Sequence, residues 1–231
     1  MSSGKLFLLG GDAVLDTVAD EFVPAAGERE VVIALLMQGG SGWEKYVPRY
    51  AEPWARRGAT CCYPIAPDES GELDLEDVSA KLRKATGIYI GGGHTPTYHR
   101  LYAAEPIRSL IRKRHQAGVP VAGLSAGALI ALDVCVFDSN EIEQNSSRIV
   151  PGLGLVHDLL VEVHFTEWNR LPDLLEAMVQ TGTHVGWGID EAACMVVEEG
   201  QFRRVLGRSV HKVMMSDFES RAYEMVEWSM S

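Results

Sequence analysis

Short apolar runs alternate with longer amphipathic segments through the first half of the chain. The runs are nearly continuous, at Leu6–Leu9, Val31–Met37, Thr60–Ile65, Ile88–Ile90 and Val119–Leu124. A strand whose sheet is covered by helices on both faces is apolar throughout, whereas a half-exposed strand alternates between apolar and polar residues. These runs therefore predict the buried strands of a parallel sheet.

The segments between the runs have the spacing of amphipathic helices, over Tyr46–Arg57, Leu75–Lys84 and Thr95–Ala117. Asp74 precedes the second segment, where an aspartate commonly caps a helix. The third segment is long enough for two helices with a break near Pro106. Strands that alternate with helices predict a doubly wound α/β fold, with a mostly parallel sheet flanked by helices.

The pattern changes after residue 185, where apolar segments become short and closely spaced. They lie at Val185–Ile189, Ala193–Val197 and Phe202–Leu206, with turn-forming residues at 198–200. This spacing predicts an antiparallel hairpin toward the C-terminus. Because no Pro- or Ser-rich linker divides the chain, we expect a single domain over residues 1–231.

Composition and charge narrow the classes of partner. Of the 231 residues, 46% are hydrophobic, and 21 Lys and Arg face 32 Asp and Glu, for a net charge of −11. An acidic protein lacks the basic face needed to bind nucleic acid or an anionic membrane. No apolar run approaches the ~20 residues of a membrane span, and the N-terminus lacks a signal-peptide core. We therefore expect a cytoplasmic protein, either monomer or homodimer.

The cysteines give no sign of a metal or redox site. Cys61 and Cys62 are adjacent, and Cys135 and Cys194 lie far from them, so there is no CxxC pair. We expect reduced core cysteines, no metal ion and no organic cofactor.

The segment Gly123-Leu124-Ser125-Ala126-Gly127 is a G-x-S-x-G motif between a predicted strand and a helix-like run. In a nucleophile elbow the serine occupies a strained turn that only small neighbours allow, and its Oγ is exposed. The next N–H, that of Ala126, points toward a developing oxyanion at the helix N-terminus. The motif predicts Ser125 as a nucleophile, and the alternative is a serine that merely caps the helix.

Three glycines and a histidine, Gly91-Gly92-Gly93-His94, follow the preceding predicted strand. Neighbouring parallel strands bring their ends together, and glycine allows close approach and free orientation of its N–H group. We therefore expect Gly92 or Gly93 to supply a second oxyanion donor and His94 to line the pocket, the alternative being a plain tight turn.

A serine nucleophile needs a base, and the base needs an acid that orients it. Among the seven histidines, His164 is favoured because it ends the alternating run Leu160–Val163, and His94 is second. The pattern does not choose among the candidate acids, which are Asp138, Glu141, Glu143, Asp190 and Glu191.

Together these segments resemble the aspartyl dipeptidase (peptidase E) and cyanophycinase family of serine peptidases, whose fold is related to that of class I glutamine amidotransferases. The resemblance is carried, in the family's order, by Gly91–Thr95, Gly123–Ala128, His164–Thr166 and Gly188–Ala192. It implies Ser125 as nucleophile and His164 as base.

The resemblance also bears on the acid and on the substrate. It favours Glu191 as the acid, although another interpretation of the family places the acid between the serine and the histidine. Arg170 resembles a family arginine that meets a substrate carboxylate, and a planar guanidinium suits such a contact. The chain departs from the family at His94, where Asn or Gln is usual. Trp168 stands where cyanophycinases have an arginine, which argues against cyanophycin as substrate.

These observations predict a serine peptidase that hydrolyses small peptides, in particular dipeptides with an acidic Asp residue at the scissile bond, through a Ser-His-Glu triad. Two alternatives stay open. One is an acyl hydrolase or esterase that uses the same site, and the other is a catalytically silent binding protein of the amidotransferase-like fold.

Overall fold

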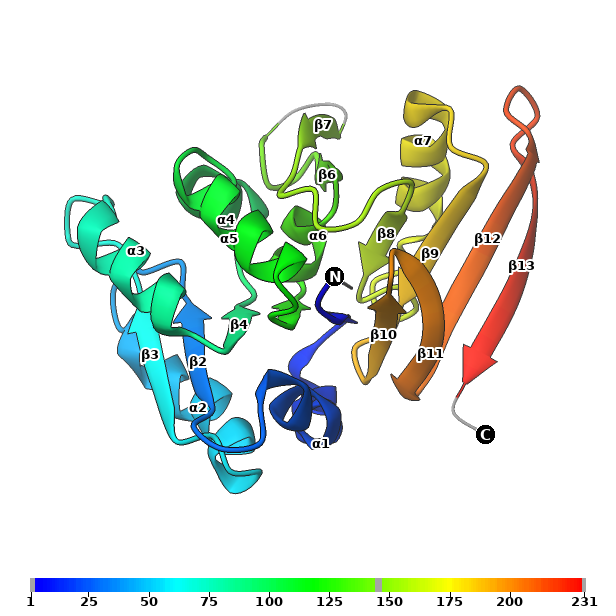
Figure 1. Ribbon diagram of the computed structural model, residues 1–231. Coiled ribbons are helices and arrows are strands. Elements are labelled where there is room, and N and C mark those ends of the chain that lie inside the picture. Colours follow the sequence, from blue (N-terminus) through cyan, green and yellow to red (C-terminus); the bar gives the residue numbers. More distant parts are fainter. Residues whose placement is uncertain (1–2, 144–146, 230–231) are drawn as a thin grey trace.

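A seven-stranded sheet forms the centre of the structure, a computed structural model that describes residues 3–143 and 147–229 (Figure 1). Its strand order is β11-β10-β1-β5-β4-β2-β3. The parallel strands are β1 (Leu6–Leu9), β2 (Val32–Leu36), β3 (Cys61–Ile65), β4 (Gly87–Ile90) and β5 (Val121–Leu124). They coincide with the five apolar runs, so the predicted parallel sheet is confirmed.

Helices cover both faces of this sheet. On one face lie α1 (Leu15–Ala26) and α2 (Tyr46–Arg56), and on the other lie α3 (Leu75–Lys84), α4 (Thr95–Tyr102), α5 (Ile107–Gln116) and α6 (Ala126–Ala131). Because side chains alternate along a strand, Phe7 packs against the first set and Leu8 against the second. Short 3₁₀ helices lie at Asp12–Val14 and Trp43–Lys45.

Local signals in the sequence set the helix boundaries. The Asp74 carboxylate accepts hydrogen bonds from the N–H groups of Glu76 (3.0 Å) and Asp77 (3.1 Å), so the predicted cap of α3 is confirmed. The long helical segment is divided between α4 and α5, and Pro106 stands at the N-cap of α5. A proline lacks the N–H that a helix interior requires, which explains the break.

A second, four-stranded sheet has the order β13-β12-β9-β8. It contains β8 (Leu160–Val163), β9 (Val185–Ile189), β12 (Ser209–Asp217) and β13 (Ala222–Ser229), and α7 (Leu171–Thr181) packs on it. A two-stranded sheet pairs β6 (Val134–Phe137) with β7 (Arg148–Pro151).

The predicted hairpin is confirmed as β10 (Ala193–Glu198) and β11 (Gln201–Gly207), which extend the main sheet in antiparallel fashion. Val185–Ile189 does not join this hairpin but lies in the second sheet beside β8. Packing in that sheet is close at one position, because a Cβ on Gly188 would lie 2.2 Å from Cγ of Phe165, so residue 188 has to be a glycine.

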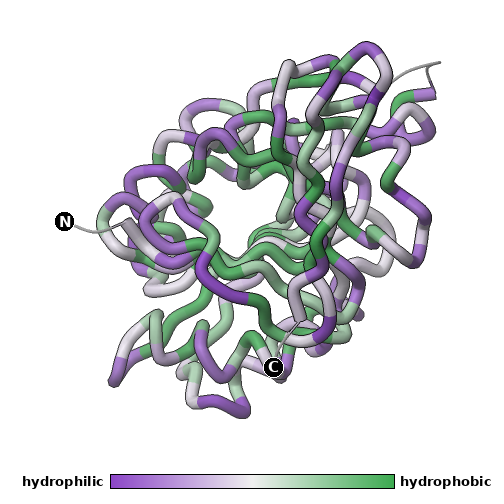
Figure 2. The backbone as a smooth tube through the Cα atoms, turned by 90° about the vertical axis from the view of Figure 1, so that its right-hand side faces the viewer, coloured by the Kyte–Doolittle hydropathy of each residue, from purple (hydrophilic) through white to green (hydrophobic). Residues whose placement is uncertain are grey.

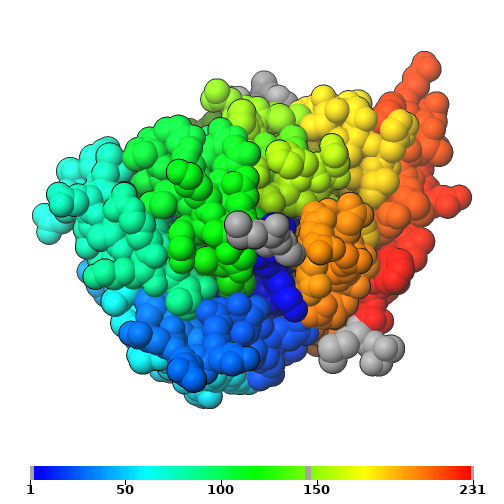
Figure 3. Space-filling view, in the orientation of Figure 1, coloured from blue at the N-terminus to red at the C-terminus, as the bar shows by residue number. Residues whose placement is uncertain are grey.

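Apolar residues concentrate in the central strands, whereas outer helices and loops are polar (Figure 2). Helix α3 and the C-terminal strands β12 and β13 lie on opposite sides of the molecule (Figure 3), whereas the N-terminal strand β1 pairs with β10. Within the described part of the chain, no helix combines the length and apolar character required to span a bilayer.

Candidate active site

Ser125 lies on a sharp turn between β5 and α6. Its φ of 50° is in the left-handed region, which costs a residue with a Cβ roughly 1–2 kcal/mol. A Cβ on Gly123 would lie 2.4 Å from the carbonyl oxygen of Gly127, and a Cβ on Gly127 would lie 2.3 Å from that of Ile90. The G-x-S-x-G spacing is thus a steric requirement of this corner. The Ser125 side chain makes no capping hydrogen bond to α6, which removes the alternative of a mere helix cap.

The structure places Ser125, His164 and Glu191 in one hydrogen-bonded row. Ser125 Oγ lies 2.8 Å from Nε2 of His164, and Nδ1 of His164 lies 3.1 Å from Oε1 of Glu191. Because a carboxylate only accepts, Nδ1 carries the ring proton and Nε2 presents a lone pair to the serine hydroxyl. His164 follows β8, and Glu191 follows β9, which pairs with β8 in parallel.

Burial sets the protonation state of His164. Burial has the largest effect on the pKa of the imidazole and lowers it below the ordinary value of 6.5, while the Glu191 carboxylate raises that pKa. The ring is therefore neutral at neutral pH and able to accept a proton. The Trp168 ring stacks on it, with centroids 4.0 Å apart, and covers one of its faces although Trp168 itself is 62% exposed.

The other candidate acids lie elsewhere. Asp138 pairs with Arg170, and Glu141 accepts hydrogen bonds from the N–H (2.8 Å) and hydroxyl (2.9 Å) of Thr95. Glu143 is exposed. The structure thus brings Glu191, rather than the acids that follow the elbow helix, within reach of the imidazole.

The glycines of the β4–α4 loop lie beside the elbow. A Cβ on Gly92 would contact Cβ of Ser125 at 3.3 Å, and Gly93 lines the cavity next to the serine. His94 does not line that cavity. Its ring is hydrogen-bonded to Thr97 Oγ1 (2.9 Å) and to the Glu141 carbonyl (3.0 Å), so the structure gives it a role in the loop instead of the pocket predicted from sequence.

A cavity of about 120 Å³ opens beside Ser125 and is strongly acidic. Three carboxylates and one guanidinium are among its lining residues, which are Gly93, Thr95, Ser125, Leu129, Val136, Asp138, Glu141, Glu162, Val163, His164, Trp168 and Arg170. A neighbouring hollow of about 380 Å³ shares several of these walls, so the acidic surface continues past the serine.

Arg170 lies in this cavity, as the sequence predicts, but its charge is already neutralised. Its guanidinium pairs with Asp138, with Asp173 at 3.1 Å and with Glu162 at 3.3 Å. Its side chain is 15% exposed. A substrate carboxylate would have to displace one of these three carboxyl groups from the guanidinium. Nothing in the linear sequence pattern indicated that Arg170 is paired in this way.

Glu162 is a site residue that the sequence analysis missed. It is the one charged residue in the apolar run Leu160–Val163, all of which is buried in β8, and that isolated carboxyl group was the signal in the sequence. Its side chain is 3% exposed. Burial raises its pKa to about 7 even though Arg170 pulls the pKa down, so the carboxyl group titrates near neutral pH.

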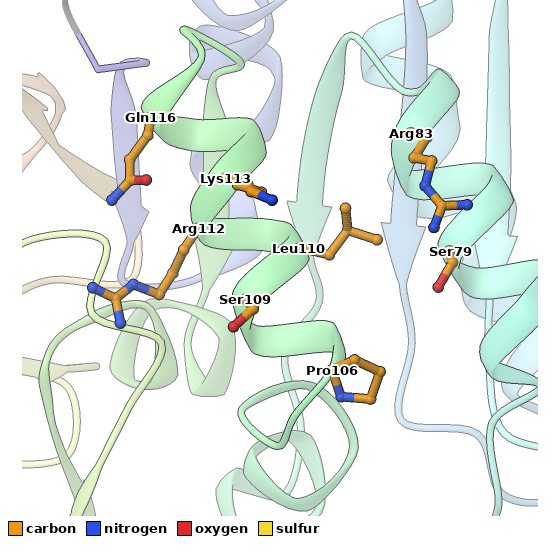
Figure 4. A pocket seen from close by; sticks show the side chains of 8 residues that line it. All are labelled: Ser79, Arg83, Pro106, Ser109, Leu110, Arg112, Lys113 and Gln116. Atoms are coloured by element: carbon orange, nitrogen blue, oxygen red, sulfur yellow. The ribbon is translucent and has the colours of Figure 1, made fainter.

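A larger hollow, about 500 Å³, lies between α3 and α5 (Figure 4). Three cations and two serines are among its lining residues, which are Ser79, Arg83, Pro106, Ser109, Leu110, Arg112, Lys113 and Gln116. It contains no histidine or carboxylate that would activate its serines, so the smaller cavity is the candidate site. Across residues 3–143 and 147–229, no group of three or more His, Cys, Asp or Glu side chains is arranged to hold a metal ion.

A serine, a histidine and a carboxylate lie in hydrogen-bonded order at a nucleophile elbow of an α/β sheet. This arrangement defines the class of serine hydrolases. The chain belongs to peptidase family S51, whose family model matches residues 67–205, and it is a serine-type peptidase.

Known relatives agree with this assignment. A cyanophycinase of Geminocystis herdmanii is 25% identical over 210 residues, which are 89% of this chain and 76% of that protein. The chain covers 55% and 45% of two further cyanophycinases. A peptidase E of Shewanella denitrificans is 40% identical over 55 residues, 24% of this chain and 23% of that protein. A solved peptidase structure from an acI-B1 Actinobacterium shares the fold, with a TM-score of 0.73 at 17% identity, over 99% of this chain and 98% of the other.

Proposed function

We propose that the chain hydrolyses small peptides with Ser125 as nucleophile, His164 as general base and Glu191 as orienting acid. The observation that carries this proposal is the row of two hydrogen bonds, 2.8 Å and 3.1 Å, that begins at the strained elbow. A residue is held in a strained conformation at a cost, and such strain is concentrated at functional sites.

In this mechanism Ser125 Oγ attacks the scissile carbonyl carbon while Nε2 of His164 takes its proton. The N–H groups of Ala126 and of Gly92 or Gly93 stabilise the oxyanion. The imidazolium then protonates the leaving amine, and an acyl-enzyme remains on Ser125. A water molecule, deprotonated by His164, releases the acid product. Glu191 holds Nδ1–H and stabilises the imidazolium throughout.

The pH dependence of kcat/KM tests the pair of His164 and Glu191. Protonation of the base abolishes activity, so we expect an acid limb with a midpoint below about 6.5. Because Glu191 raises the pKa of His164, Glu191→Gln should move this limb to still lower pH. We expect kcat to fall by as much as ~10⁴-fold, since the acid no longer stabilises the imidazolium. Glu143→Gln is the control, and an unmoved limb in folded Glu191→Gln would show that the carboxylate does not act on His164.

The substrate proposed from the sequence is a dipeptide with Asp at the scissile bond, bound by Arg170. The structure changes which part of the substrate we expect the cavity to bind. The carboxyl groups of Asp138, Glu141, Glu162 and Asp173 outnumber the single guanidinium of Arg170, so the remaining negative charge attracts the free α-ammonium of a dipeptide. An Asp side chain, by contrast, must share the guanidinium with Asp138. We therefore propose that the cavity recognises the amino terminus of a short peptide.

A paired comparison of an Asp-containing dipeptide with its Asn analogue tests the role of Arg170. In Arg170→Met we expect kcat/KM to fall for both substrates by about tenfold or more, because buried carboxylates lose their counterion. The two losses should agree within about threefold. If Arg170 bound the substrate carboxylate, a bond worth ~1.5–3 kcal/mol would be lost, so the Asp dipeptide alone would suffer by roughly 10- to 150-fold. Arg221→Met, which breaks an exposed ion pair with Glu176, is the control.

Cyanophycin is a second candidate substrate. The observation that favours it is the match with a cyanophycinase over 89% of this chain. The hollow that adjoins the cavity at Asp138, Glu162 and Arg170 also offers room for a chain longer than a dipeptide. Release of soluble product from insoluble cyanophycin, compared with turnover of dipeptides, decides between the two.

A fluorophosphonate probe followed by mass spectrometry of the labelled peptide tests the proposed function itself. Labelling at Ser125 together with amine release from a dipeptide library would support a peptidase. Labelling with turnover of esters alone would indicate an esterase. A folded protein that is not labelled would be a silent binding protein.

A further inference from the structure

A buried carboxylate ties the turn that carries His164 to the strand end that carries Glu191. Oδ1 of Asp190 accepts hydrogen bonds from the Thr166 N–H (3.1 Å) and the Thr166 hydroxyl (2.7 Å). The Phe165 N–H donates to the Ile189 carbonyl at 3.2 Å. These three bonds fasten two short segments to each other, and His164 and Glu191 are the immediate neighbours of the fastened residues.

His211, on β12, binds the other oxygen of the same carboxylate. Its Nε2 lies 3.2 Å from Oδ2 of Asp190 and 3.4 Å from the Thr166 hydroxyl, and both Asp190 and His211 are only 8% exposed. Because the carboxylate accepts, Nε2 carries the proton. The Phe165 ring packs on the His211 ring with centroids 5.2 Å apart. Through these contacts of His211, strand β12 of the four-stranded sheet touches the turn that carries His164.

The turn needs such support because its first residue is strained. His164 has a φ of 50°, a left-handed conformation that costs a residue with a Cβ roughly 1–2 kcal/mol. Such a conformation persists only where the surrounding structure over-determines it. The bond from Phe165 to the Ile189 carbonyl begins immediately after His164, and the bonds to Asp190 follow one residue later at Thr166, so all three are placed to hold His164.

We propose that Asp190 and His211 are positioning residues that hold the His164 imidazole between Ser125 and Glu191. This proposal rests on the proposed function of that row. Neither residue lines the cavity, and the Asp190 carboxylate faces Thr166 and His211 instead of the imidazole. Asp190 is thus not a competing triad acid, and it acts through the geometry of the turn.

The test compares Thr166→Val, which removes the hydroxyl bond to Asp190, with Thr166→Ser, which keeps it. His211→Phe keeps the ring packing but removes the N–H. We expect Thr166→Val and His211→Phe to lower kcat by about 10- to 100-fold with KM unchanged within about threefold, because a small displacement of a catalytic group costs about that much. Thr166→Ser should stay within about threefold of wild type.

Matched controls separate positioning from a general loss of stability. Thr181→Val removes a hydroxyl that bonds to the Ala177 carbonyl, and His184→Phe removes a ring nitrogen that bonds to the Met215 carbonyl. Both should keep kcat while altering the thermal midpoint about as much as the test variants. Equal kcat in Thr166→Val and Thr181→Val would overturn the proposal, as would losses confined to KM. If His211→Phe does not fold, the Thr166 pair decides.

A readout without turnover distinguishes failure of this proposal from failure of the proposed function. We expect the proton on Nδ1 of His164, hydrogen-bonded to Glu191, to give a low-field proton NMR signal in the resting protein. We expect Thr166→Val to shift or abolish it and Thr181→Val to leave it in place. An unchanged signal in folded Thr166→Val would overturn the positioning role, whatever the wild-type chain hydrolyses.

Discussion

Ser125→Ala is expected to lower kcat by on the order of 10⁶-fold while the chain stays folded. The substitution removes one oxygen atom, and the hydrogen bond of that atom in the structure is the one to His164. The oxygen does not cap α6, and alanine carries the same Cβ as serine, so the strain of the elbow is unchanged. The expected loss therefore comes from the chemistry alone.

The measurement is steady-state turnover of a dipeptide, with circular dichroism and the thermal midpoint as the test of folding. Ser79→Ala is the matched control, because Ser79 lines the hollow between α3 and α5 without a histidine. Turnover by folded Ser125→Ala within about 100-fold of wild type would contradict the assignment of the nucleophile.

His164→Ala is expected to be as damaging as Ser125→Ala, and the double variant little worse than either single one. Residues that act as one unit lose their function together, so their effects do not add. Nε2 of His164 is the acceptor 2.8 Å from the hydroxyl, whereas the nearby carboxyl groups of Asp138 and Glu141 are bonded to Arg170 and Thr95.

The control is His94→Ala, since His94 was the second candidate base. Its ring is engaged by Thr97 and by the Glu141 carbonyl outside the cavity, so we expect a loss of less than about tenfold. A severe loss in His94→Ala beside a mild one in His164→Ala would reverse the assignment. Additive losses in the Ser125 and His164 double variant would argue against a shared step.

The parallel half of the fold was predictable because its signals are local. A strand covered on both faces is apolar at every position, as β1 and β2 are, and this pattern needs no knowledge of the partners. The cap at Asp74 and the break at Pro106 are likewise properties of a few neighbouring residues.

The C-terminal strands β12 and β13 were not predicted. Every residue of β13 is exposed, so the strand has no buried face to impose a period on its sequence. It exists because it pairs with β12, over a register that joins Ser209 to Ser229 and Met215 to Tyr223. Such pairing is a tertiary event, and short apolar runs in this region do not specify it.

The same distinction applies to the site. The elbow at Ser125 was predictable, because its glycines and its strand and helix are adjacent in sequence. The local pattern did not choose the acid, because Glu191 lies 27 residues from His164 and several carboxylates have similar surroundings in the chain, and only the family resemblance favoured Glu191. The neutralisation of Arg170 depends on Asp138, 32 residues earlier, and on the buried face of β8, which no local pattern reveals.

Ser125 ends a strand of the seven-stranded sheet, His164 ends a strand of the four-stranded sheet, and Glu191 lies in the connection from β9 in one sheet to β10 in the other. The reacting row therefore crosses the boundary between two separately hydrogen-bonded units. Substitutions that stabilise one sheet without moving it against the other are expected to leave the reaction rate unchanged. A shift of one unit against the other by about an ångström is expected to slow the proposed reaction by about 100-fold while leaving the secondary structure intact.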